Sequence, residues 1–161
     1  MSNRSLTTRL HLADGTVVNG ESFGAPVSAT GEVVFATGMV GYPEALTDPS
    51  FHGQILVMTY PLIGNYGVPK GPFESDRPWI RGLIVQGYTP QHSHADAVES
   101  LGEWLTRYGI PAITGVDTRA LTKRLREQGV MLGQIVKEGD APERIVPDPN
   151  SRNLVTEVSI K

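Results

Sequence analysis

The sequence predicts a mixed, β-rich α/β domain with two β layers and one helical layer. The 18 Gly and 12 Pro among 161 residues break the chain into short apolar runs, which is typical of short strands joined by turns. Helical periodicity is confined to the second half, over residues 96–108 and 118–128. Because no helix with a G-x-G-x-x-G motif follows the first strand, a doubly wound nucleotide-binding fold is disfavoured.

Composition excludes several classes of protein and site. The formal net charge is -3 and the basic residues are scattered, so neither a nucleic acid nor a membrane surface is expected as a partner. No apolar run approaches the roughly 18 residues of a spanning helix. The chain has no cysteine, which excludes disulfides, thiolate metal sites and a cysteine nucleophile within it.

The first element is expected to be a β-hairpin. Residues 9–13 alternate apolar and polar side chains, and a second apolar run begins at Val17. Asp14 and Gly15 between them are a strong hairpin signal, with Gly15 adopting a positive φ. Residues 20–24 are expected to end the hairpin.

Three further strands are predicted to be buried on both faces. Residues 32–37, 55–58 and 82–88 contain continuous apolar runs rather than alternating ones, and this pattern is typical of strands covered on both sides. Residues 70–78 are expected to form a mobile surface loop.

Two helices are predicted, over residues 96–108 and 118–128. In the first helix, four side chains share one face at helical spacing: Val98, Leu101, Leu105 and Tyr108. Ser93 or Asp96 is expected to cap its start, and Gly109 follows its end. In the second helix, Leu121 and Leu125 are expected to face the core. Asp117 or Thr118 is expected to cap its start, and Gly129 to end it. Short strands are expected at 112–113 and 130–136.

The connection from 38 to 54 is the main candidate for a functional surface, because long structured connections usually carry binding residues. Pro43 suits the first position of a helical turn, and Asp48 followed by Pro49 ends it. Ser50 is then left on an exposed turn with a free hydroxyl. The alternative is that Ser50 is a turn or cap residue.

Other constellations favour structural interpretations. His92 and His94 could be a metal pair, but the sequence places no third ligand, so polar residues at a helix entry are the better reading. Glu44 and Asp48 resemble a glycosidase pair only in residue type, and turn and cap roles are favoured. Residues 64–67 (GNYG) could cradle an anion, yet they lack the Lys and Ser/Thr of a P-loop, so a tight turn is expected.

Seven motifs together resemble one known family. They occur in this order: GEVVF (31–35), GMVGYPE (38–44), LTDPS (46–50), GQIL (53–56), YPLIGNYG (60–67), GVDTRALT (115–122) and LREQG (125–129). The chain resembles the N-terminal domain of the small, glutamine-hydrolysing subunit of carbamoyl phosphate synthetase, in its eukaryotic-type form. The resemblance implies a three-layer β/β/α swivelling-type domain over residues 10–137. A disordered tail is expected at 1–9, and 138–161 is expected to be a linker towards a glutamine amidotransferase domain that is absent from this sequence.

The resemblance also implies a role for Ser50. In the family, the serine of the Asp-Pro-Ser turn reaches the glutamine pocket of the neighbouring amidotransferase domain, and Ser50 matches it. The N-terminal domain is expected to be non-catalytic alone and to dock the glutaminase part to the synthetase part. A hydroxyl at this place would orient glutamine rather than attack it.

The wider expectations concern the parent enzyme. It would convert glutamine, bicarbonate and ATP into carbamoyl phosphate, as the first step of pyrimidine or arginine biosynthesis. No cofactor is expected in this domain, whereas the synthetase portion uses ATP with Mg or Mn. A cytoplasmic location is expected, with a mitochondrial one as the alternative. The competing hypothesis for the chain is a stand-alone module that binds an amino acid.

Overall fold

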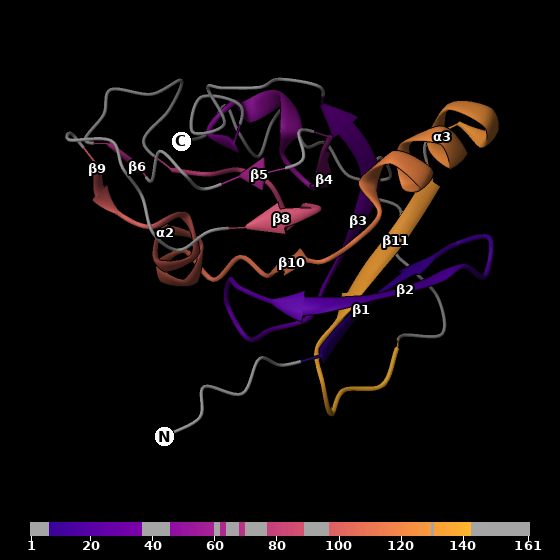
Figure 1. Ribbon diagram of the computed structural model, residues 1–161, viewed down its shortest axis with the longest axis horizontal. Coiled ribbons are helices and arrows are strands. Elements are labelled where there is room, and N and C mark those ends of the chain that lie inside the picture. Colours follow the sequence, from indigo (N-terminus) through magenta and orange to yellow (C-terminus); the bar gives the residue numbers. More distant parts are fainter. Residues whose placement is uncertain are drawn as a thin grey trace.

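Seven strands close into a barrel in the computed structural model of the chain, which describes residues 7–36, 46–59, 62–63, 68–69, 77–88, 97–129 and 131–142 (Figure 1). In chain order they are β1 (Thr7–Leu12), β2 (Val17–Ser22), β3 (Ala29–Ala36), β4 (Gln54–Met58), β7 (Gly82–Ile84), β10 (Ala112–Thr114) and β11 (Met131–Val136). Around the barrel they follow the order β1-β11-β3-β4-β7-β10-β2. Strands β3, β4, β7 and β10 run parallel to one another, and the remaining pairings are antiparallel.

The predicted N-terminal hairpin is confirmed. β1 and β2 pair antiparallel with Leu10 opposite Val18, and Gly15 in the turn has a φ of 92°. The turn is also tied to a distant helix, because the Arg124 guanidinium donates to the Asp14 carboxylate at 2.9 Å. β1 begins at Thr7, so the strand extends into the range 1–9 in which a tail is expected.

Burial on both faces is confirmed for β4 and β7, whereas in β3 the side chains of Val34 and Phe35 are only half-buried. In β4, Ile55 and Val57 point into the barrel interior, whereas Leu56 and Met58 pack on the outside in a second core. All four are at most 2% exposed. This explains the continuous apolar run, because a strand covered on both sides has no solvent face.

The strand predicted over 82–88 is two strands. β7 ends at Ile84, and β8 (Gly87–Tyr88) leaves the barrel to pair with β5 (Leu62–Ile63). An exposed Gln86 lies between them. The apolar run could not reveal where β7 ends, because Val85 lies beyond its last residue and is still buried like Leu83 and Ile84.

The first predicted helix starts later than expected. α2 spans Leu101–Arg107, because Ser100 and Glu103 form a capping box at its start: Glu103 N donates to Ser100 Oγ at 3.1 Å, and Ser100 N donates to Glu103 Oε1 at 3.2 Å. The preceding Ala97–Glu99 is a strand, β9, paired with β6 (Val68–Pro69). Val98 therefore belongs to a strand, and the predicted start at residue 96 was wrong. Gly109 has the expected positive φ of 72°.

The second helix agrees with its prediction. α3 spans Thr118–Gln128, and the carboxylate of Asp117 caps it by accepting from Ala120 N at 3.0 Å. Leu121 and Leu125 are buried with the side chains of the barrel interior. Gly129 follows the last turn with a φ of 79°.

The predicted mixed α/β class with two main helices is confirmed, and its layers can be identified. α2 packs through Leu101, Trp104 and Leu105 on the outer face of the barrel wall that β4, β7 and β10 form. The interior of the barrel separates that wall from β1 and β11. The two β layers are therefore opposite walls of one barrel. No helix of the described residues is long and apolar enough to cross a membrane.

Several predicted features lie outside the described residues. These are most of the 1–9 tail, the turn begun by Pro43 together with Glu44, the 64–67 turn, most of the 70–78 loop, the caps Ser93 and Asp96, the pair His92 and His94, and most of the 138–161 linker.

Candidate functional site

A short 3-10 turn, η1 (Pro49–Phe51), lies directly before β4 and carries Ser50. Asp48 is its N-cap, in extended conformation, and its Oδ1 accepts from the Ser50 backbone N–H at 3.0 Å. Such a bond, from an Asp side chain to the backbone N–H two residues on, is typical of turns that contain Asp. Pro49 occupies the first position, where its fixed φ suits the turn.

The turn is fixed at both ends by the core. Leu46 and Thr47, before it, are fully buried. The Trp79 backbone N–H donates to Leu46 O at 2.9 Å, which ties this segment to the strand region that precedes β7. Phe51 packs against the core cluster that includes α2. The backbone around residue 50 is therefore held in one place by buried neighbours.

Ser50 itself is exposed, in contrast to its anchors. Its N–H is taken by Asp48, and the described residues offer no hydrogen-bond partner to its hydroxyl. A serine hydroxyl can donate one hydrogen bond and accept others, so this oxygen is available to a ligand or a neighbouring domain. The structure therefore places the predicted site residue on the surface, on a backbone that is not free to move away.

A shallow cavity lies beside this turn, and the sequence did not predict it. Its volume is about 360 Å³, and its lining includes His52, Arg77, Trp79 and Tyr108. The His52 ring meets the Trp79 ring edge-on, with centroids 5.3 Å apart, and the Arg77 guanidinium lies 4.1 Å from the centroid of the same indole. These residues come from three segments that are distant in the sequence, around residues 52, 77–79 and 108, so spacing in the sequence offered no signal.

Among the described residues, His11 is a further titratable group and lies apart from the Ser50 turn, on another element. His11 lies on β1, and its Nε2 is buried without a hydrogen-bond partner. Burial, with a smaller contribution from the charge on Arg9, lowers the pKa of His11. Within the described ranges, no group of three or more His, Asp or Glu side chains could hold a metal ion.

Comparison with known proteins identifies the family. The family model for the carbamoyl-phosphate synthase small chain, CPSase domain, matches residues 10–135. The chain belongs to this family. The matched range contains the seven motifs, the complete barrel except its outermost strand residues, and both helices.

Relatives of this CPSase domain are much longer proteins. The chain is 50% identical to Multifunctional protein URA2 of Saccharomyces cerevisiae over 94% of the chain but only 8% of that protein. It is 46% identical to the carbamoyl phosphate synthase arginine-specific small chain of Eremothecium gossypii, covering 99% of the chain and 43% of the relative. It is 47% identical to the mitochondrial carbamoyl-phosphate synthase [ammonia] of Mus musculus, covering 100% of the chain and 11% of that relative. The chain thus spans less than half of the length of each of these relatives.

Proposed function

We propose that this chain is the non-catalytic N-terminal domain of a glutamine-dependent carbamoyl phosphate synthetase. In the parent enzyme it docks the glutaminase part to the synthetase part and contributes the Ser50 hydroxyl to the glutamine site. Family membership and the far greater length of the relatives support a role within a larger enzyme. The observation that carries the role of Ser50 is its exposure on a turn that directly follows the buried Leu46 and Thr47.

The chemistry of the site suits an orienting role. Glutamine is a zwitterion with a neutral side-chain amide, and a hydroxyl can bond either end without introducing a charge that needs pairing. The chain contains no cysteine, so a thiol nucleophile has to come from another domain. ATP, with Mg or Mn, is used by the synthetase portion. The product serves pyrimidine or arginine biosynthesis, in the cytoplasm or alternatively in the mitochondrion.

The experiment is a comparison of nitrogen donors in the complete enzyme carrying Ser50→Ala. Glutamine-dependent synthesis should fall by the equivalent of one hydrogen bond, about 0.5–1.5 kcal/mol in kcat/KM. Synthesis from added ammonia should be unchanged, because ammonia bypasses the glutamine pocket. The measurement is the rate of carbamoyl phosphate formation with each donor.

The matched control is Thr7→Ala, which removes an exposed hydroxyl from β1 and should affect neither donor. Equal loss with glutamine and ammonia in Ser50→Ala would indicate a damaged fold or interface and would contradict the proposed contact. Both nitrogen donors have to be tested, because the name of the relative from Mus musculus specifies ammonia. If the parent enzyme used ammonia alone, no glutamine-dependent rate would be present to lose.

A further inference from the structure

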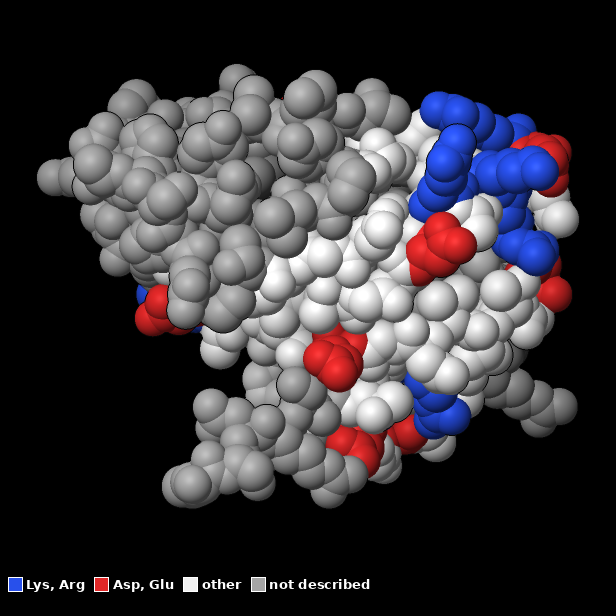
Figure 2. All heavy atoms as spheres, viewed as in Figure 1, with Lys and Arg blue, Asp and Glu red and all other residues white. Residues whose placement is uncertain are grey.

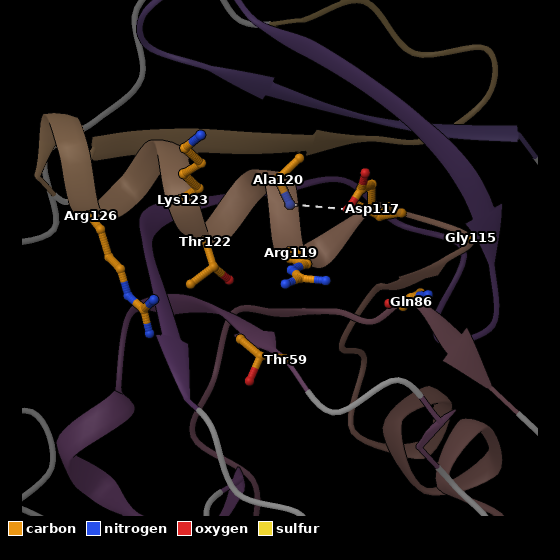
Figure 3. A pocket seen from close by; sticks show the side chains of 10 residues that line it. Thr59, Gln86, Gly115, Asp117, Arg119, Ala120, Thr122, Lys123 and Arg126 are labelled. Carbon is orange, nitrogen blue, oxygen red and sulfur yellow. Dashed lines mark hydrogen bonds between the residues drawn. The ribbon is translucent and has the colours of Figure 1, made fainter.

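A large cavity lies at the edge of the barrel where the parallel strands β4, β7 and β10 end. Its volume is about 1160 Å³. Thr59 follows β4, Gln86 follows β7 and Gly115 follows β10, and all three line the cavity (Figure 3). In α/β folds, ligands bind outside the carboxyl ends of parallel strands. We call this the α3 cavity, because α3 forms its opposite wall.

Two arginines and a threonine of α3 face the cavity. Arg119, Thr122 and Arg126 are spaced i, i+3 and i+7, so they share one side of the helix. Figure 3 shows their side chains directed towards the strand ends that carry Thr59 and Gln86. The Arg126 guanidinium also lies 5.2 Å from the centroid of the Phe35 ring, a cation–π distance.

The described residues that line the cavity carry an excess of positive charge. Arg119, Lys123 and Arg126 are basic, and Asp117 is the acid among them. Figure 2 shows Lys and Arg side chains gathered at the end of the molecule where Figure 1 places α3. Within the described part of the chain, no acid forms an ion pair with Arg119 or Lys123. The neighbouring Arg124 instead pairs with Asp14 at 2.9 Å.

A buried hydroxyl in the lining is a second indication that the cavity binds a ligand, and it does not depend on charge. Thr122 is only 6% exposed, and its Oγ1 has no hydrogen-bond partner. A buried polar atom without a partner costs free energy, so such atoms in native proteins require an explanation. A ligand oxygen that accepts from this hydroxyl would provide one.

We propose that the α3 cavity binds a small molecule carrying a diphosphate or triphosphate group. Arg119 and Arg126 are about 10 Å apart along the helix axis, which suits an extended polyanion better than a single phosphate. Planar guanidinium groups bind phosphate oxygens through paired hydrogen bonds, and the positive end of the α3 dipole lies beside the strand ends. This site is separate from the Ser50 turn and does not depend on the glutamine role.

The test is a calorimetric titration of the 161-residue chain with pyrophosphate and with ADP at about 150 mM salt, where diffuse attraction is screened. Saturable binding of either probe is expected, and Arg119→Gln with Arg126→Gln should weaken it by at least about tenfold. The control is Arg124→Gln, which removes the same kind of charge outside the cavity and should leave affinity unchanged. If the double variant does not fold, Arg119→Gln alone decides.

A second variant separates ligand binding from folding. Thr122→Val keeps the shape of the side chain and removes the unpaired hydroxyl, so stability should be maintained or increased while affinity falls several-fold. Unchanged affinity in this variant would contradict the proposed contact. Absence of saturable binding at millimolar probe, or equal weakening by Arg124→Gln, would overturn the site. Saturable binding of a polyglutamate peptide alone would show instead that α3 recognises an acidic protein segment.

Discussion

At the scale of single residues, the presentation of Ser50 depends on Asp48, because the Asp48 carboxylate accepts a hydrogen bond from the Ser50 backbone N–H. Asp48→Ala removes this acceptor and should lower the free energy of unfolding by about 1 kcal/mol. The measurement is urea denaturation of the chain. The control Asp48→Asn keeps an acceptor oxygen and should lie close to the parent. If both variants lost the same stability, the charge rather than the hydrogen bond would be responsible.

His11 makes a prediction about pH at the same scale. Its pKa is lowered in the folded chain, mainly by burial, so the unfolded chain takes up a proton first as the pH falls. The associated stability is therefore complete above the unfolded pKa of about 6.5 and is lost as the pH falls through the lower, folded pKa.

The comparison is between the parent and His11→Gln, both unfolded with urea at several pH values from about 7.5 downwards through the His range. The parent should lose more stability than the variant over this interval, because only the parent must protonate His11 in the unfolded state. Parallel losses in the two proteins would mean that His11 does not titrate differently on folding.

At the scale of elements, the capping box decides where α2 begins. Ser100→Ala removes the Oγ that accepts from Glu103 N and should cost about 1 kcal/mol of unfolding free energy. Ser100→Thr keeps a hydroxyl and serves as the control. The prediction would be contradicted if the Thr and Ala variants were equally destabilised in urea denaturation.

The two helices together show what local sequence can and cannot reveal about where a helix begins. Asp117 and Gly129 bracket α3 so clearly that its bounds could be predicted. For α2, the apolar spacing suggested an earlier start, since Val98 falls on the same helical face as Leu101. Pairing with β6 places Val98 in a strand, and that pairing involves residues distant in the sequence. Tertiary contacts decide such boundaries.

At the scale of the whole molecule, burial was predictable but closure was not. The continuous apolar run of β4 correctly indicated a strand covered on both faces, as Ile55 and Leu56 show by packing in different cores. The barrel, however, closes by pairing β1 with β11, the first described strand with the last. Nothing in the periodicity of either strand specifies that partner.

Of the two candidate sites, one could be predicted from the sequence and the other could not. The Ser50 turn could be predicted because Asp48 and Pro49 act on adjacent residues. The role of its hydroxyl came from the family resemblance and remains a prediction. The α3 cavity could not be foreseen, because it brings together a helix face and three strand ends that meet only in the folded chain.

The central claim is that the glutamine site is shared, with this chain supplying Ser50 and a neighbouring domain supplying the rest. The most direct measurement is calorimetric titration of the 161-residue chain with glutamine. No saturable heat is expected, because one hydroxyl on an exposed turn cannot enclose an amino acid. Saturable glutamine binding that Ser50→Ala abolishes would contradict the claim and would show that the chain is a complete amino-acid-binding module.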